Sequence, residues 1–485
     1  MSLFNSFIDA PIALSDILLI EDTPEILDFR CPLSSILVWP NVRLLFLRTI
    51  MGDLLYSSSN SMDFPILGNS CKAVSSLTRA FLHNGSMAIG RSMCADILLK
   101  TEGVGDEWTG AAWFNRYADP FVTAAEARTT VLLDMFEWNW NEPRCAPQSY
   151  YHAPIQAVSA LRGRQSSTAA KFQATALVDL LERRALEILG WKLSAERRNY
   201  LYKTFAAKIT GLPYQDSAYR KLLQRVKPKL LLGSSGCYGN HAPLWLAANE
   251  MGIVTAEYQH GAISQGHDAY NYSATIVASE AYRQYFPKYL LSYGDWWNEQ
   301  VNVPVEKISI GYPSREEKLT QITQQDCSLQ RNILLLGDGV EFELYLKLAQ
   351  DIAAALDATD LRVVIRPHPL ERTAVIARWG QNVGKVCIDT NANIYTAFSE
   401  AHTVISEVST GLFEAVGLAK RVIIIGSKKS RFCFPESPFA ISNSVQEIVS
   451  IVLGSETAPS GQSENRIWAP NWRENFREFF REKVK

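Results

Sequence analysis

The sequence lacks the features that identify nucleic-acid-binding or membrane-spanning proteins. Its 485 residues carry a formal net charge of -2, and no Lys/Arg block dominates any segment, so nothing in the charge favours nucleic acid as a partner. No uninterrupted apolar run approaches the roughly 20 residues that a membrane helix needs. Met1–Asp22 also lacks the basic start, apolar centre and small-residue cleavage site of a signal peptide. We therefore expect a cytoplasmic protein, at most peripheral to the inner face of the membrane.

The sequence also lacks a recognisable metal site. The cysteines are scattered, without a Cys-x-x-Cys pair or a His-Cys cluster of zinc-ligand spacing. No Asp-x-Asp pair stands at the end of a predicted strand. We expect reduced thiols, no fixed metal, and no cofactor other than an activated substrate. The eight cysteines are Cys31, Cys71, Cys94, Cys145, Cys237, Cys327, Cys387 and Cys433.

The first part of the chain indicates an irregular α/β unit. Short apolar runs at Ile17–Ile20, Ser35–Trp39 and Ala95–Leu99 predict strands between loops rich in Ser, Asn and Pro. The pattern then changes, because apolar residues in Ser166–Val226 recur mostly three to five positions apart, which is typical of helices. We expect an N-terminal domain at 1–315 with a helical insertion at about 166–226.

Strands and helices alternate after this insertion. Leu230–Leu232 and Ile253–Tyr258 predict strands on either side of a helix at Ala242–Met251, which implies a right-handed parallel crossover. The Gln-rich polar segment Ser314–Arg331 has no apolar period, so we expect an interdomain linker at 316–330. Further strands are predicted at Ile276–Ala278, Tyr289–Ser292 and Lys307–Ile310.

A second alternating series follows the linker, and we expect a C-terminal domain at 331–470. Two such series joined by one linker predict two doubly wound, Rossmann-like α/β domains that face each other across a cleft. The predicted strands are Asn332–Leu336, Leu361–Arg366, Lys385–Ile388, Thr403–Ser406 and Arg421–Ile425. The predicted helices are Glu341–Leu356, Glu371–Arg378, Ile394–Ser399 and Thr410–Gly417.

The tail 471–485 has the pattern of an amphipathic helix. Trp472, Phe476, Phe479 and Phe480 share one face, and Arg and Glu occupy the other. Such a helix can lie on a membrane surface. We favour docking against the protein, because the acidic side chains of the helix would be repelled by anionic lipid.

Arg366 and His368 end a predicted buried strand, in the sequence Arg-Pro-His-Pro. In an open parallel sheet, ligands bind beyond the carboxyl ends of the strands. The strand therefore delivers a cationic Arg and a hydrogen-bonding His to the cleft, and Pro367 and Pro369 restrict the backbone around them. A structural role stays open, in which Arg366 pairs with a carboxylate and His368 packs.

A second polar motif, Ser406-Glu407-Val408-Ser409-Thr410-Gly411, ends the strand at Thr403–Ser406. If a helix begins near Ser409, its unpaired N–H groups lie beside clustered hydroxyls and form a phosphate cradle. The alternative is an ordinary Ser/Thr N-cap. The succession of both motifs in one domain is stronger evidence than either motif alone.

These motifs resemble those of GT-B fold glycosyltransferases, particularly bacterial surface-polysaccharide enzymes: the CDP-glycerol glycerophosphotransferases, the capsule Kdo transferases and the bacterial sialyltransferases. The resemblance covers Lys229–Gly426 and includes Gln-His-Gly at 259–261 and Gly-Tyr-Pro at 311–313. It implies that His368, Ser409 and Thr410 contact the donor phosphate. It also implies, more weakly, that Glu414 on the following helix contacts the donor ribose.

The resemblance leaves the catalytic base open. In glycerophosphotransferase-like enzymes the His of a His-Gly pair is a candidate base, so His260 is the leading candidate. Bacterial sialyltransferases resemble one another in an acidic-acidic-Gly motif of the N-terminal domain, whose second acid is the base. Glu102-Gly103 matches its placement with only one acid. Asp338 lies between two glycines at the start of the C-terminal domain, where it could instead contact the nucleotide or acceptor, or form a turn.

The sequence thus predicts a metal-independent GT-B glycosyltransferase of bacterial surface-polysaccharide synthesis (capsule, or O-antigen and lipopolysaccharide). It would transfer a sugar or polyol phosphate from a nucleotide-activated donor, with CMP-sialic acid, CMP-Kdo-like or CDP-linked donors favoured, to a glycan or lipid-linked glycan acceptor. Arg366, His368 and the Ser409–Gly411 turn would neutralise the leaving nucleotide. A UDP-sugar 2-epimerase and a non-catalytic assembly subunit remain alternatives.

Overall fold

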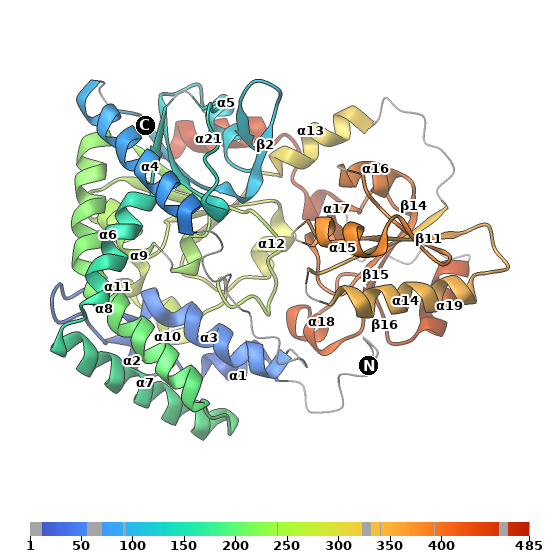
Figure 1. The fold of residues 1–485 in the computed structure, drawn as a ribbon, viewed down its shortest axis with the longest axis horizontal. Helices are drawn as coiled ribbons and strands as arrows, with labels where there is room; N and C mark the ends of the chain where they lie inside the picture. The colour runs from blue at the N-terminus through green and yellow to red at the C-terminus, as the bar shows by residue number, and fades with distance from the viewer. Residues whose placement is uncertain are drawn as a thin grey trace.

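The protein folds into two lobes that lie side by side (Figure 1). The computed structural model describes residues 12–55, 70–90, 94–146, 148–239, 241–322, 331–339, 341–369, 371–391, 393–454 and 464–484. Each lobe is built around one seven-stranded sheet. The prediction of two doubly wound, Rossmann-like α/β domains is therefore confirmed.

The N-terminal sheet is parallel throughout, in the order β5-β4-β1-β6-β7-β8-β9. Its central strands are buried on both faces, which explains their nearly continuous apolar sequences. The strands are β1 (Ile97–Glu102), β4 (Thr129–Asp134), β5 (Ser149–Tyr151), β6 (Leu230–Gly233), β7 (Val254–Tyr258), β8 (Tyr289–Ser292) and β9 (Glu306–Ser309).

The C-terminal sheet has the order β12-β13-β11-β10-β14-β15-β16, and only β12 runs antiparallel to its neighbour. Three of its central strands begin or end within two residues of the predicted bounds, and β10 and β15 match them. The strands are β10 (Asn332–Leu336), β11 (Arg362–Arg366), β12 (Asn382–Val383), β13 (Val386–Ile388), β14 (Ala401–Ser406), β15 (Arg421–Ile425) and β16 (Ala440–Ser442).

Helices cover both faces of each sheet, as burial of a parallel sheet requires. One face of the N-terminal sheet packs against α6 (Ala153–Arg164), α8 (Ala195–Val226) and α9 (Ala242–Glu250), and the other against α5 (Asp119–Ala125). One face of the C-terminal sheet packs against α14 (Phe342–Ala355), α15 (Arg372–Trp379) and α19 (Val445–Leu453), and the other against α16 (Ile394–Ser399), α17 (Thr410–Glu414) and α18 (Lys428–Cys433).

The predicted helical insertion is occupied by two long helices, α7 (Thr168–Leu189) and α8. The predicted linker is helical where it is described, because α13 covers Pro313–Ile322 and packs Leu319 against the core. The remainder, 323–330, lies outside the described residues. The other elements are α4 (Ser70–Gly90), α11 (Glu280–Arg283), α12 (Asp295–Glu299), α20 (Glu464–Ile467), the hairpin β2 (Asp106–Trp108) and β3 (Trp113–Asn115), and 3-10 turns at Gly103–Gly105, Phe136–Trp138 and Gly236–Tyr238.

Three strand predictions were wrong. Ile17–Ile20 lies at α1 (Leu14–Leu18), which is followed by α2 (Pro24–Leu27), and Ser35–Trp39 leads into α3 (Trp39–Leu55). Ile276–Ala278 is part of α10 (Ala274–Ala278). The physical reason is that an apolar run of three to five residues fits either structure. Local capping decides in α10, where the Ser273 side chain accepts a hydrogen bond from the backbone of Ile276.

The C-terminal helix α21 (Trp472–Lys483) returns to the N-terminal lobe and lies beside α5 (Figure 1). Its apolar face is buried in the core that covers one face of the N-terminal sheet, and the ring centroid of Phe476 lies 4.8 Å from that of Phe121. Docking against the protein was therefore the correct interpretation of the tail. None of the described helices has the length and apolar character needed to cross a membrane.

The two lobes pack directly through aromatic side chains. Trp297 of α12 in the N-terminal lobe has its ring centroid 4.5 Å from that of Phe413 in α17 of the C-terminal lobe. Trp468, which follows α20, contacts both lobes, since its indole N–H donates to the Phe413 carbonyl and its ring stacks on Tyr312. This shared core holds the carboxyl ends of the two sheets in a fixed relation.

Candidate active site between the two sheets

Two of the motifs singled out in the sequence meet between the lobes. The Gln-His-Gly motif follows β7, and the backbone N–H of Ala262 just after it donates to the Thr410 hydroxyl over 2.9 Å. A Cβ placed on Gly261 would lie 3.9 Å from the same oxygen. The loop that carries His260 and the turn that begins α17 therefore form one interlobe contact.

A cavity of about 340 Å³ lies beside this contact, which is within the range of ligand sites. The C-terminal lobe contributes four of the predicted donor-binding residues to its wall: Arg366, His368, Ser409 and Glu414. The N-terminal lobe contributes the segment after β1, from Val104 to Glu107, together with Arg116 and Tyr312. The cavity thus brings residues of both lobes around one space.

Arg366 is almost fully buried and forms an ion pair with Asp389. Asp389 also accepts a hydrogen bond from the backbone of Asn391, so the carboxylate is fixed. The structural role that the sequence left open for Arg366 is therefore present. The guanidinium also lines the cavity, so its orientation toward a ligand is set in advance by Asp389.

His368 is held by the turn that follows β10. Gly339 in this turn has a φ of +85°, and a Cβ there would lie 3.1 Å from the His368 Nδ1 atom. The backbone N–H of His368 donates to Glu371 over 2.9 Å. Burial lowers the pKa of His368, so its imidazole is neutral at neutral pH in the empty site.

The Ser406–Gly411 motif contributes both to the packing of the C-terminal lobe and to the wall of the cavity. Ser406 is buried and donates to the Leu336 carbonyl, and Ser409 caps α17 by accepting from the backbone of Gly411. Gly411 packs tightly, since a Cβ there would lie 2.6 Å from Leu336. The helix is only five residues long and ends at Glu414, so the predicted end at Gly417 was wrong. Its dipole is correspondingly small.

Asp338 is buried, with one oxygen accepting from the Glu341 backbone and the other 2.8 Å from the Lys429 ammonium. Glu407 lies 3.6 Å from the same ammonium. Asp338, Glu341 and Glu407 bring carboxylate oxygens within 4.8 Å of one another. Lys429 already provides the positive charge that such a group needs, which gives Asp338 a structural task inside the C-terminal lobe.

The two N-terminal candidates for the base both lie at the carboxyl ends of strands, Glu102 on β1 and His260 after β7, with β6 between them. Glu102 ends β1, its side chain is 37% exposed, and its carboxylate lies 3.9 Å from the Lys100 ammonium. His260 is partly buried, and among the described residues its Nδ1 atom has no hydrogen-bond partner. Its ring centroid lies 5.6 Å from that of Tyr238.

The same edge carries a polar cluster that the sequence did not reveal: Lys100, Asp134, His152 and His241. Asp134 ends β4 and receives the Lys100 ammonium at 3.1 Å and the His152 Nδ1 atom at 2.6 Å. The sequence does contain one signal for Asp134. The β-branched and apolar run Thr129–Leu133 ends in this acid, a pattern that predicts a buried strand with a carboxylate at its end.

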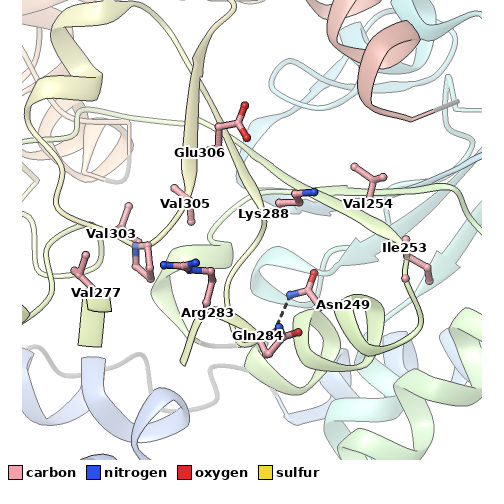
Figure 2. Close-up of a pocket in the computed structure, with 12 residues that line it drawn as sticks. Asn249, Ile253, Val254, Val277, Arg283, Gln284, Lys288, Val303, Val305 and Glu306 are labelled. Carbon is pink, nitrogen blue, oxygen red and sulfur yellow. Dashed lines mark hydrogen bonds between the residues drawn. The ribbon is translucent and has the colours of Figure 1, made fainter. Parts of the chain in front are cut away.

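A larger hollow, of about 650 Å³, lies elsewhere in the N-terminal lobe (Figure 2). Val254, Lys288 and Glu306 place it at the amino ends of β7, β8 and β9. Doubly wound sheets bind ligands at the carboxyl ends of their strands. We therefore assign the candidate active site to the smaller interlobe cavity, where the motifs converge.

The contact between Ala262 and Thr410 yields a first test. Replacing Thr410 by valine keeps the side-chain shape but removes the acceptor, so we expect it to cost about 1 kcal/mol of stability. Thr410→Ser keeps the hydroxyl and should cost less. Urea unfolding followed by tryptophan fluorescence measures both. A serine variant that is destabilised more than the valine variant would show that the methyl group, not the hydrogen bond, matters.

No protein-family model matches the chain, and neither does any curated protein. Similar solved structures include the UDP-GlcNAc 2-epimerase of Neisseria meningitidis bound to UDP-GlcNAc, at 13% identity and a TM-score of 0.44 over 79% of this chain and 99% of that one. The Methanocaldococcus jannaschii UDP-GlcNAc 2-epimerase in complex with UDP-GlcNAc and UDP has 12% identity and a TM-score of 0.42 over 79% and 98%. Acinetobacter baumannii MurG has 12% identity and a TM-score of 0.39 over 79% and 98%. Because this similarity is so low, the two-sheet fold is established by the strand pairing within this chain, and the function has to be argued from the residues of the site.

Proposed function

We propose that the protein is a glycosyltransferase of the GT-B type. It transfers a sugar or polyol phosphate from a nucleotide-activated donor to a glycan or lipid-linked glycan acceptor in bacterial surface-polysaccharide synthesis. The observation that carries this proposal is the interlobe cavity, in which Arg366, His368, Ser409 and Glu414 face the segment after β1. The resemblance of the Gln-His-Gly, Arg-Pro-His-Pro and Ser-Thr-Gly motifs favours CMP-linked or CDP-linked donors.

Charge at the leaving group is the chemical problem that these residues solve. When the bond from the sugar to the donor phosphate breaks, negative charge grows on the nucleotide. Arg366 supplies a fixed positive charge, and His368 becomes cationic beside the phosphate. The Ser409 hydroxyl donates a further hydrogen bond, and Glu414 accepts from the ribose. In this mechanism protein cations do the work that a divalent metal does in other transferases.

The remaining predicted residues have supporting tasks in this proposal. Asp338 and Ser406 hold the loops of the donor lobe, and Thr410 with Gly411 couples these loops to the His260 loop. Glu102 stands where the acceptor would enter from the N-terminal lobe. We place the enzyme in the cytoplasm. Peripheral association with the membrane would come from binding of a lipid-linked acceptor.

Thermal unfolding with CMP, CDP, UDP and GDP tests the proposal. A ligand that binds only the folded state raises the unfolding midpoint, so we expect CMP or CDP at millimolar concentration to give the largest shift. No shift with any nucleotide would contradict the proposed donor site. Conversion of UDP-GlcNAc without an acceptor would instead favour a 2-epimerase. Full function with both His260 and His368 replaced would favour a non-catalytic assembly subunit.

A further inference from the structure

We propose that His241 takes the proton from the acceptor hydroxyl, within the polar cluster of Lys100, Asp134, His152 and His241. The inference rests on the proposed function, since it names the base of that transfer reaction. None of the sequence motifs that resemble known transferases contains a member of this cluster. The assignment rests on the position of the cluster and on the hydrogen bonds that both ring nitrogens of His152 form. It also rests on the ring of His241, with which none of the described residues forms a hydrogen bond.

His241 lies between two segments that already reach the cleft, and the rest of the cluster lies at or beside the first of them. In the sheet order β4-β1-β6-β7, Asp134 ends β4, Glu102 ends β1, and His241 starts α9 directly after the β6 turn. On one side, Val104 after β1 lines the interlobe cavity. On the other, the loop after β7 bonds to Thr410. The carboxyl ends of the strands in and beside this interval therefore point toward the same cleft.

Three members of the cluster, Lys100, Asp134 and His152, contact one another through Asp134. His152 is inaccessible to solvent, with its Nδ1 atom 2.6 Å from Asp134 and its Nε2 atom 2.6 Å from the Tyr219 hydroxyl. Asp134 has its second oxygen 3.1 Å from the Lys100 ammonium, which is also buried. Because both nitrogens of His152 have partners, its ring is not open to a substrate proton, and Lys100 and His152 hold the pKa of Asp134 well below its usual value. His152 and Asp134 position their neighbour.

His241 differs from these groups. Its Nε2 atom lies 3.8 Å from Asp134, its side chain is 12% exposed, and none of the described residues forms a hydrogen bond with its ring. Its ring centroid lies 4.8 Å from that of His152. Hydrogen bonds at catalytic groups are often long before substrate binds, and shorten in the complex. His241 is therefore the imidazole at the accessible end of a chain that runs from Tyr219 through His152 and Asp134.

The electrostatic setting agrees with this geometry. Burial, together with Lys100 and His152, lowers the pKa of His241 well below its usual value, so the ring is neutral and has a lone pair to offer. Burial alone would raise the pKa of Asp134, but Lys100 and His152 hold that pKa well below its usual value. Asp134 is therefore a permanent anion, and it stabilises the imidazolium that forms when His241 takes a proton.

The step balances as a single displacement. The acceptor O–H bond breaks and its proton moves to the free nitrogen of His241, while the oxygen forms a bond to the anomeric carbon of a sugar donor or to the phosphorus that carries the polyol in a CDP-polyol. The bond from that carbon or phosphorus to the phosphate oxygen of the leaving nucleotide breaks, and its electron pair leaves with the nucleotide between Arg366 and His368. The imidazolium then returns its proton to water. No oxidant, reductant or further reactant is required.

Two other groups compete for the role of base. The His260 loop is tied to Thr410 of the other lobe, and its Nδ1 atom is buried, which suits a group that holds the lobes and the donor in register. Glu102 is open to solvent at the same edge and suits a group that orients the acceptor hydroxyl. Burial raises the pKa of Glu257, the carboxyl that interacts with His260, whereas Lys100 and His152 hold the pKa of Asp134 beside His241 well below its usual value.

The test compares His241→Asn with His402→Asn, a matched change in β14 of the other lobe. The probes are CMP-sialic acid and CDP-glycerol, and the readout is nucleotide release with water as the acceptor. We expect His241→Asn to lower the rate about 100-fold or more, the size of a lost general base. Its thermal shift with CMP or CDP should equal that of the wild type. His402→Asn should retain both the rate and the shift.

A structural role for His241 would not be rescued by a free base. Added imidazole should therefore restore nucleotide release to His241→Gly and leave the wild type unchanged. The acid side of the wild-type pH–rate profile should fall below the usual histidine pKa of about 6.5, because Lys100, His152 and Lys208 all disfavour the cationic ring and only Asp134 favours it.

The outcomes separate this inference from the function on which it rests. A normal nucleotide shift with an unchanged rate in His241→Asn overturns the inference alone, and a large loss in Glu102→Gln or His260→Asn would then identify the base. Absence of a nucleotide shift in the wild type overturns the proposed function and the inference with it. A normal shift with a lost rate, rescued by imidazole, supports both.

Discussion

Replacing His368 by alanine is expected to abolish the stabilisation of the protein by CMP or CDP while leaving the fold intact. The side chain is only half-buried, and its ring packs on the Gly337–Gly339 turn without filling the core of the lobe. Hydrogen bonds to charged groups contribute about 1.5–3 kcal/mol. The loss of such a bond to phosphate weakens nucleotide binding by roughly 10- to 100-fold. Calorimetric titration of both proteins measures this difference.

The pH dependence of binding gives a second readout for His368. Burial lowers the pKa of the imidazole in the empty site, and a bound phosphate raises it again by favouring the cation. A nucleotide sugar therefore takes up a proton as it binds, and its affinity should rise as the pH falls from about 8 to about 6. The phosphodiester itself does not titrate in this window. His368→Ala should remove this dependence.

His402→Asn again provides the matched control, because His402 lies in β14 beside Arg421 and away from the cavity. Nucleotide affinity should be unchanged in that variant. If His368→Ala bound nucleotide as tightly as the wild type, the donor phosphate would have to lie elsewhere than at the Arg-Pro-His-Pro motif.

The C-terminal lobe could be predicted closely from the sequence because its strands and helices alternate with short loops. In such a series each apolar run is either a buried strand of about five residues or one side of a longer helix, and length separates the two. The run Asn332–Leu336 and the period of Phe342–Ala355 are of this kind. Motifs at the strand ends then fall at one edge of the sheet, which is why Arg366, His368 and Ser409 meet in one cavity.

The N-terminal lobe was harder to predict because its sheet is assembled from distant parts of the chain. β1 pairs with β6 across the helices α6, α7 and α8, so strand neighbours are more than 100 residues apart, as the register Ile97 to Leu230 shows. Short strands such as β5 have too few residues to show a pattern. The cluster at their ends was therefore invisible: Asp134 and His152 come from neighbouring strands, and His241 joins them only through the fold.

The ion-pair partners of buried charged residues could not be predicted from the sequence either. The sequence suggested that Arg366 might pair with a carboxylate but gave no means to select Asp389, which lies after the next strand in the sheet. Lys429 is an ordinary lysine in a polar segment until the fold places it between Asp338 and Glu407. Such pairs depend on where the ends of separate elements meet, and local patterns carry no record of that.

The largest stability loss is expected from Arg43→Met in α3. The guanidinium is buried, with its Nε atom 2.6 Å from Glu21, and it donates to the backbone carbonyls of Asp268 over 2.6 Å and Asn271 over 2.8 Å. It thereby ties α3 and the segment before it to the loop after β7, which carries His260. Removing the cation leaves the Glu21 carboxylate buried without a counter-charge, and such a break costs about 3–5 kcal/mol.

Two comparisons separate lost charge pairing from lost packing in this variant. The exposed pair of Arg183 and Glu25 makes a 3.8 Å contact, so Arg183→Met should shift the urea midpoint very little. Adding Glu21→Gln to Arg43→Met removes the stranded carboxylate and should recover part of the loss, since the amide oxygen still accepts from one of the two donors that Glu21 binds, the Trp39 indole or the Ser273 backbone. A double variant that is no more stable than Arg43→Met would show that the backbone contacts of Arg43, and not its pairing with Glu21, hold α3 against the loop after β7.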